Sequence, residues 1–219
     1  LFFNNAKLPE LRRYCNIHNS LPIEDCSQST GSETLPRVSD FAVYSFYPTK
    51  PLGSMGDGGM LCFQDEIWVE IFKNMRFYGQ KDGKIARVGV NSRMDEWQCA
   101  VILEKMRVFH NLNQLRREIA HIYDSCIKGI KARSGCVYHQ YPILYRQRSK
   151  VLTDLKKEGI PYIIHYPWHV SDMSALHGIH NTVGFRVNDR IVSLPCHPHL
   201  KEWEIDKITT FLKNSAQYQ

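Results

Sequence analysis

The sequence predicts an α/β protein in two parts, an incomplete large domain with helices layered on a sheet and a small α+β domain. Three observations lead to this class. Amphipathic helical stretches alternate with short apolar runs over residues 8–79. One helical pattern then continues from about residue 95 to about residue 130, a length typical of helices that join domains. Helices and strands alternate again after it, so we place the domains at residues 1–115 and 116–219.

The first region is expected to contain two helices and three strands. The helices follow from a 3.6-residue apolar period and are expected at residues 8–18 and 64–79. The strands are short apolar runs bounded by turn residues, expected at residues 21–23, 40–47 and 60–63. A strand should precede the first helix of such a fold, so we expect the chain to be part of a longer protein or a natural remnant of one.

The region after the long helix reads as a small α+β domain. Its strands are expected at residues 137–145, 162–164 and 190–193. Its helices are expected at residues 148–158, where Gly159 ends the pattern, and at residues 201–214. Residues 80–89, which precede the long helix, read as a glycine-containing loop.

Composition excludes several classes of protein. Lys and Arg number 28 against 22 Asp and Glu, and the charge of +6 is scattered, so no basic face indicates nucleic-acid binding. No apolar run approaches the ~18 residues that a membrane helix needs. The seven cysteines form no CxxC pair and are odd in number, which is typical of reduced cysteines in a cytoplasmic protein.

Lys50 stands between an aromatic strand and a turn rich in glycine, in the stretch "YSFYPTKPLGSMGDGG". Burial beside the aromatic residues disfavours the charged form of a lysine, and a neutral lysine can act as a Schiff-base nucleophile. A solvated lysine whose aliphatic stem covers the aromatic rings is the alternative, and position alone favours it.

Asp25 favours the interpretation of Lys50 as a Schiff-base nucleophile. It ends the first apolar strand, and ligands bind at the carboxyl ends of strands in open α/β sheets. Pyridoxal 5'-phosphate (PLP) needs a lysine for its aldehyde, a carboxylate for its ring nitrogen and donors for its phosphate. Asp25, Lys50 and the hydroxyl of Ser45 would supply these three groups from two successive strands. In isolation, a helix cap or a salt bridge explains Asp25 equally well.

Six blocks then occur in a characteristic order, "IEDCSQSTGS", "YSFYPTKPLGSMGDGGMLCF", "FKNMRFYGQ", "VGVNSRMDEWQCAVILEKM", "GIPYIIHYPWH" and "SLPCHPHL". With these blocks the chain resembles the DegT/DnrJ/StrS sugar aminotransferases along nearly its whole length. The resemblance implies the aspartate-aminotransferase-like fold of type I PLP-dependent transferases. Members of the family carry an N-terminal segment with a phosphate-binding loop, a stacking aromatic residue and the first strands, and we expect this chain to begin after that segment.

The resemblance also implies roles for individual residues. Lys50 would bind the cofactor aldehyde, and Asp25 would pair with the ring nitrogen. Gln28 would contact the ring hydroxyl, and Ser45 the phosphate. Asn91 would reach the phosphate of the cofactor held by the neighbouring subunit, so the family implies a homodimer with shared active sites.

Three further residues are expected to contact the substrate. Arg93, in the same block as Asn91, resembles a residue that contacts the substrate or its carboxylate. His165 and Tyr166 read as residues that line the pocket. His165 and His169 have the spacing of a helical metal-binding pair, but Pro167 lies between them and excludes that helix, so no metal is expected.

The resemblance implies transamination, in which L-glutamate donates an amino group and a ketosugar linked to a nucleotide receives it. The family's dehydratases have histidine in place of the lysine, and Lys50 argues against that branch. The alternative is a truncated, catalytically silent family member, or a partner subunit, without the N-terminal half of the PLP-binding domain.

Overall fold

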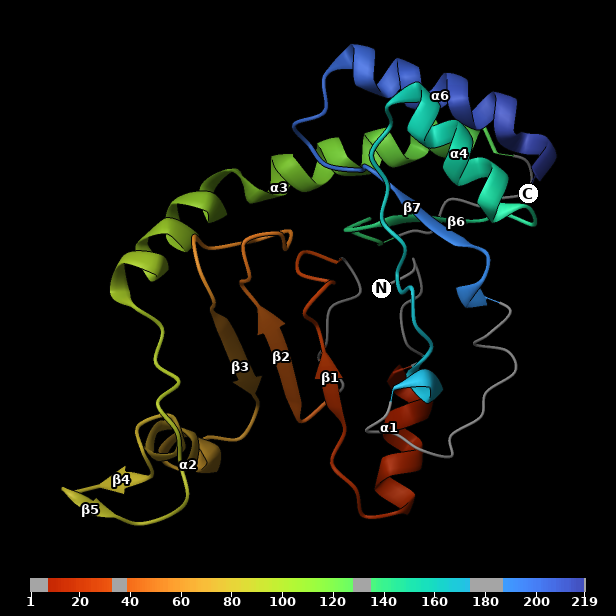
Figure 1. Cartoon of the computed structure of the whole chain (residues 1–219). Helices are drawn as coiled ribbons and strands as arrows, with labels where there is room; N and C mark the ends of the chain where they lie inside the picture. The colour runs from red at the N-terminus through yellow and green to blue at the C-terminus, as the bar shows by residue number, and fades with distance from the viewer. Residues whose placement is uncertain (1–7, 33–38, 128–134, 174–186, 219) are drawn as a thin grey trace. The chain divides into compact units, whose positions relative to one another are not determined.

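The computed structural model in Figure 1 describes residues 8–32, 39–127, 135–173 and 187–218. Its contacts divide the chain into two compact units, an N-terminal unit, Asn5–Asn111, and a C-terminal unit, Leu112–Gln219. The division falls inside one continuous helix, α3 (Glu96–Ser125), which the sequence predicted as a long helix. The domain boundary after residue 115 stays a prediction.

The N-terminal unit contains a three-stranded sheet formed by β1 (Ile23–Asp25), β2 (Phe41–Ser45) and β3 (Gly59–Phe63). The strands lie in the order β1-β2-β3, and β1 runs parallel to β2 while β3 runs antiparallel to it. Because β1 and β2 are parallel, their carboxyl ends meet at the same end of the sheet (Figure 1).

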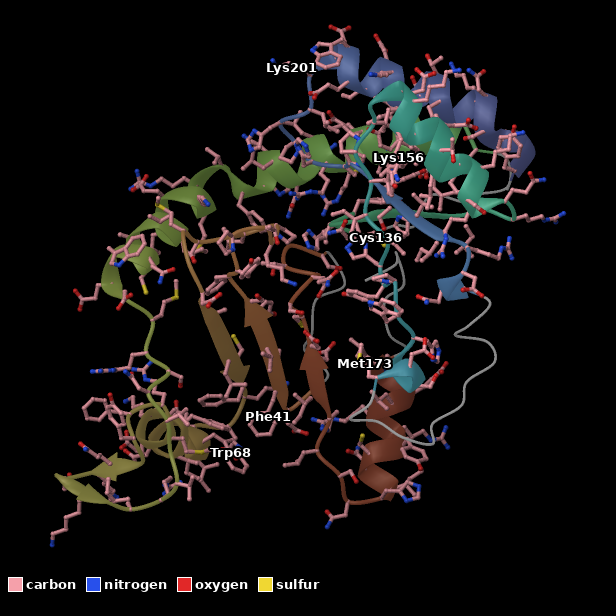
Figure 2. The ribbon with its side chains drawn as sticks, viewed as in Figure 1. Phe41, Trp68, Cys136, Lys156, Met173 and Lys201 are labelled. Atoms are coloured by element: carbon pink, nitrogen blue, oxygen red, sulfur yellow. The ribbon has the colours of Figure 1, made fainter. Side chains whose placement is uncertain are left out.

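Besides the first half of α3, two helices and a hairpin are described in the N-terminal unit. They are α1 (Leu8–Ile17), α2 (Ile67–Met75) and the pair β4 (Gln80–Lys81) and β5 (Lys84–Ile85). Phe41 at the start of β2 contacts the Trp68 ring of α2 edge-on, with ring centroids 5.2 Å apart; Figure 2 labels both residues. The aromatic contact therefore places α2 at the start of β2, the end of the sheet away from Ser45.

The hairpin corrects the expectation of a plain loop after α2. Strands of two residues carry no alternating apolar pattern, so the sequence did not reveal them. Asp82 and Gly83 form the turn with positive φ angles of 50° and 76°. At Gly79, φ is +71° and a Cβ atom would lie 1.8 Å from the carbonyl oxygen of Arg87, so only glycine allows this close return of the chain.

The C-terminal unit packs helices against a two-stranded antiparallel sheet, β6 (Tyr141–Leu144) and β7 (Ile191–Leu194). Its helices besides the second half of α3 are α4 (Arg148–Glu158) and α6 (Glu202–Ser215), with short 3-10 turns at Val170–Asp172 and Ala216–Tyr218. Gly159 ends α4 with φ of 62°, as the sequence predicted. The expected strand at residues 162–164 is reduced to a single bridge between Ile163 and Ser193.

The main hydrophobic core belongs to the C-terminal unit. It joins α3, α4 and α6 to the sheet, and its members include Tyr123, Tyr141, Leu155, Val192 and Leu212. A second cluster in the N-terminal unit consists of three buried residues, Phe46, Leu52 and Ile102. Among the described helices, none is long and apolar enough to cross a membrane.

Candidate active site

Two of the predicted site residues lie at the shared carboxyl end of β1 and β2. Asp25 is the last residue of β1, and Ser45 is the last residue of β2. The parallel register pairs Asp25 with Val43, two residues before Ser45. Lys50 lies in the turn that follows β2, so the backbone places all three residues at the same end of the sheet.

Asp25 is exposed and carries its charge at neutral pH. Its Oδ1 accepts a hydrogen bond from the backbone N–H of Ser27 at 3.0 Å. The Ser27 hydroxyl and this backbone N–H hold the pKa of Asp25 below its usual range, and the charge of Lys50 adds to the effect. A charged carboxylate in this position could pair with the protonated ring nitrogen of PLP.

Lys50 lies in a turn that begins directly after β2. Its backbone N–H donates to the carbonyl oxygen of Tyr47 at 2.9 Å. The Ser45 hydroxyl accepts from the backbone N–H of Tyr47 at 3.3 Å, which closes the end of the strand. The side chain of Lys50 is half-buried. The sequence left open a buried lysine and a solvated one, and the observed burial lies between these two alternatives.

Gln28 offers an acceptor without a partner. Its side-chain oxygen Oε1 is buried, and it makes no hydrogen bond to any described residue. The hydroxyl of Thr30, two residues later, is also buried and makes no hydrogen bond to any described residue. Buried polar atoms are nearly always hydrogen-bonded, so an unpaired atom near a binding site indicates that a ligand completes it. The unpaired Gln28 oxygen therefore fits the ring hydroxyl of PLP. The sequence did not single out Thr30, because an isolated threonine carries no motif.

Asn91 and Arg93 lie elsewhere in the N-terminal unit. The backbone of Asn91 pairs with Phe77, two residues beyond the end of α2. The Nε of Arg93 donates to Oδ1 of Asn91 at 3.1 Å, and its guanidinium lies over the Phe77 ring, 4.8 Å from the centroid. In Figure 1, α2 lies at the end of the sheet opposite to the tips of β1 and β2. The structure thus joins Asn91 to Arg93 and does not bring them beside Asp25.

His165 and Tyr166 belong to the C-terminal unit. The Nδ1 of His165 shares a hydrogen bond of 2.8 Å with the hydroxyl of Ser193, a buried residue of β7. Burial lowers the pKa of His165, so its neutral form is favoured. The Tyr166 ring packs edge-on against the imidazole, with centroids 5.4 Å apart, and is about half exposed. The sequence did not indicate Ser193, which orients His165 from a distant strand.

The histidines of the described residues form no metal centre. No group of three or more His, Cys, Asp or Glu residues within residues 8–32, 39–127, 135–173 and 187–218 is arranged to hold a metal ion. The nearby residues 177–180, "HGIH", lie outside the described residues. His169 uses its Nδ1 for a hydrogen bond of 2.7 Å with the Ser171 hydroxyl.

Solved structures define the class of this fold. The chain superimposes on a DegT DnrJ EryC1 StrS aminotransferase from Brucella abortus with a TM-score of 0.88 and 28% identity, covering 98% of this chain and 62% of that one. It also superimposes on S. venezuelae DesV in complex with a ketimine intermediate, with a TM-score of 0.91 and 25% identity, covering 100% of this chain and 64% of that one. The fold is that of a PLP-dependent transferase of type I, of which the chain spans part.

The chain belongs to the DegT/DnrJ/EryC1/StrS aminotransferase family, whose model matches residues 3–213. It is 33% identical to the UDP-2-acetamido-2-deoxy-3-oxo-D-glucuronate aminotransferase of Pseudomonas aeruginosa, over 88% of this chain and 57% of that protein. It is 31% identical to the UDP-N-acetyl-3-dehydro-alpha-D-glucosamine 3-aminotransferase of Acidithiobacillus ferrooxidans, over 96% of this chain and 61% of that protein. The chain therefore spans about three fifths of the length of these relatives.

Proposed function

We propose that this chain carries the PLP-binding lysine of an aminotransferase that moves an amino group from L-glutamate to a keto group of a nucleotide-linked sugar. The observation that carries the proposal is the gathering of Asp25, Ser45 and Lys50 at one end of the sheet in a member of this family. The similarity to two UDP-sugar aminotransferases supports this class of substrate.

The residues divide the chemistry between them. When bound, PLP supplies an aldehyde that takes up an amine and a ring that stabilises negative charge on the substrate carbon. Lys50 would hold the aldehyde, and its free amine would move a proton to and from the substrate carbon. Asp25 would keep the ring nitrogen protonated through its own charge. Gln28 Oε1 would accept from the ring hydroxyl, and Ser45 would bind the phosphate.

Asn91 and Arg93 act in the active site of a second copy in this proposal. Their contacts with Phe77, beyond α2, keep them away from Asp25 of their own chain. A homodimer with shared active sites would explain this arrangement. Asn91 of each subunit would contact the phosphate of the cofactor held by the partner, and Arg93 would contact the partner's substrate. His165 and Tyr166 would line the sugar pocket, with the neutral imidazole available as a hydrogen-bond donor or acceptor. We expect the enzyme in the cytoplasm, where its free cysteines stay reduced.

A covalent trapping experiment tests the proposal. We would add PLP to the purified protein, record the visible absorbance, reduce with borohydride and identify the modified peptide by mass. The expected result is a visible band that L-glutamate bleaches and a reduced adduct on Lys50. The variant Lys50→Ala should lose both, whereas Lys84→Ala, an exposed lysine of β5, should keep both.

The second candidate is the catalytically silent family member or partner subunit. The unpaired edges of the sheet, β1 on one side and β3 on the other within the described residues, favour it if no other polypeptide covers them. A folded protein that forms no adduct on Lys50 would contradict the aminotransferase proposal for this chain and support the second candidate.

A further inference from the structure

Ser54 closes the base of the turn that carries Lys50. The backbone N–H of Ser54 donates to the carbonyl oxygen of Phe46 at 2.7 Å, and the Ser54 hydroxyl lies 3.0 Å from the same oxygen. At Gly53, a Cβ atom would lie 2.3 Å from the carbonyl oxygen of Pro48, so the chain passes directly across its own backbone. We call residues 46–54 the Lys50 loop.

A residue in the first turn of α3 contacts the base of the Lys50 loop. Gln98 is 7% exposed, and its side-chain Oε1 lies 2.8 Å from the hydroxyl of Ser54. A buried amide group is costly to place unless it is hydrogen-bonded, so a buried glutamine that binds Ser54 constrains the position of both residues.

A second contact comes from Lys105. Its Nζ donates to the carbonyl oxygen of Gly53 at 2.5 Å. Between the two polar contacts, Ile102 is buried against Phe46 and Leu52 in the cluster of the N-terminal unit.

The three α3 residues share one face of the helix. Positions that are three, four or seven residues apart lie above one another on an α-helix, and residues 98, 102 and 105 have this spacing. One face of α3 therefore contacts the Lys50 loop at its base, in its apolar interior and at the Gly53 carbonyl.

We propose that Gln98 and Lys105 are positioning residues for Lys50, and that the α3 face formed by residues 98, 102 and 105 fixes the Lys50 loop for cofactor binding. This inference rests on the proposed function, since it assigns Lys50 to the cofactor. Neither residue reaches the cofactor in this proposal. They act through Ser54 and Gly53, on the backbone that carries the lysine.

Hydrogen–deuterium exchange tests the contact without any cofactor. Gln98→Met keeps the length of the side chain and removes its hydrogen bond, so the amides of Lys50 and Ser54 should exchange about tenfold faster. Lys105→Met should accelerate the exchange of the loop as well, whereas Lys105→Arg keeps a donor and should restore protection. The matched control is Glu104→Gln, an exposed neighbour on the same helix.

A double-mutant cycle identifies the route of the effect. If Gln98 acts through Ser54, the combination of Gln98→Met with Ser54→Ala should accelerate loop exchange no more than Ser54→Ala alone. Multiplied effects of the two changes would overturn the assignment of Gln98.

The chemical reactivity of Lys50 tests whether the loop positions this lysine for cofactor binding. Acetylation of Lys50, followed by mass analysis of its peptide, should become severalfold faster in Gln98→Met. The apparent Kd for PLP should rise about tenfold, and the pH midpoint of the absorbance of the PLP-bound protein should shift, while the Tm changes little. Unchanged exchange, acetylation and pH midpoint in Gln98→Met and Lys105→Met would overturn the proposal.

The two proposals fail in different ways. A wild-type protein that forms no PLP adduct on Lys50 contradicts the proposed function, and with it the role of the loop in cofactor binding. Exchange and acetylation of the apoprotein would then still report whether α3 holds the loop. A wild-type protein that binds PLP, with variants that bind it equally well, overturns the positioning role alone.

Discussion

The two units of this chain are built in opposite ways. The largest fully buried side chains of the described residues all lie in the C-terminal unit, and they include Tyr123, Tyr145, Leu155 and Leu212. The N-terminal unit has one small buried cluster around Phe46. Most of the exposed large apolar side chains lie in this unit, among them Ile17, Ile23, Met60, Ile85, Val88, Val90 and Trp97.

We infer from this difference that the stability of the chain and its proposed function depend on different units. The C-terminal unit has a core of its own, whereas the N-terminal unit carries Asp25 and Lys50 on strand ends and a turn. Its open sheet edges and exposed apolar side chains are typical of surfaces that other polypeptide covers. Changes at the site should therefore affect cofactor binding with little effect on unfolding, and changes in the C-terminal core should do the reverse.

The largest effect is expected from Asp25→Ala. If Asp25 pairs with the protonated ring of PLP as we propose, removing its charge should reduce turnover at least about a hundredfold. The Tm should stay within a few degrees of the wild type, because the Asp25 side chain is exposed and lies outside the core. Turnover with L-glutamate and thermal melting measure the two quantities. A large loss of Tm would contradict the assignment of stability to the C-terminal unit. Asp82→Asn in the exposed hairpin turn is the control.

The second prediction concerns the core of the C-terminal unit, which Leu155→Ala should destabilise. Leu155 is fully buried in the C-terminal core, so its truncation should lower the free energy of unfolding by about 3 kcal/mol. The matched change, Leu103→Ala on the exposed side of α3, should cost less than about 0.5 kcal/mol. Urea denaturation of both variants provides the measurement. Equal losses would mean that the two regions do not differ as their burial indicates.

A smaller effect is expected where α1 meets the sheet of the N-terminal unit. The guanidinium of Arg12 binds both carboxylate oxygens of Asp40, with distances of 2.5 and 3.0 Å. Both side chains are partly exposed, so Arg12→Ala should cost no more than about 1 kcal/mol in the free energy of unfolding. The loss should shrink in 1 M salt, which screens exposed charges. A loss of several kcal/mol would show that the N-terminal unit depends on this pair far more than its exposure suggests.

The smallest effect concerns pH and the C-terminal unit. Burial lowers the pKa of His165 and of His197, with His199 adding to the effect at His197. In the unfolded chain these groups take up protons near pH 6.5, whereas the folded protein resists protonation until lower pH. The unfolded state then binds more protons, so the free energy of unfolding should fall as the pH drops below about 6.5.

Urea midpoints at pH 7.5 and 5.5 test this dependence. The double variant His165→Gln, His197→Asn should reduce the fall, whereas His110→Gln on the exposed surface of α3 should not. A wild-type midpoint that rises between pH 7.5 and 5.5 would contradict the direction of both pKa shifts.

Periodicity and turn residues predicted most of the elements because these signals are local. The helix at residues 148–158 and its end at Gly159 are confirmed at their predicted bounds. The first strand is shifted, from residues 21–23 to Ile23–Asp25. Its bounds depend on which residues pair with Phe41 to Val43 of β2, and an apolar run does not encode its partner.

Local sequence therefore predicted the helices, most of the strands and the choice of Asp25 and Lys50 as candidate site residues, since helical periodicity, apolar runs and turn residues are properties of neighbouring residues. Tertiary structure alone decided the contact of Gln98 with Ser54, the unpaired oxygen of Gln28 and the separation of Asn91 from Asp25. The reason is physical: hydrogen bonds between residues distant in the chain depend on how elements pack, and packing is a property of the whole fold.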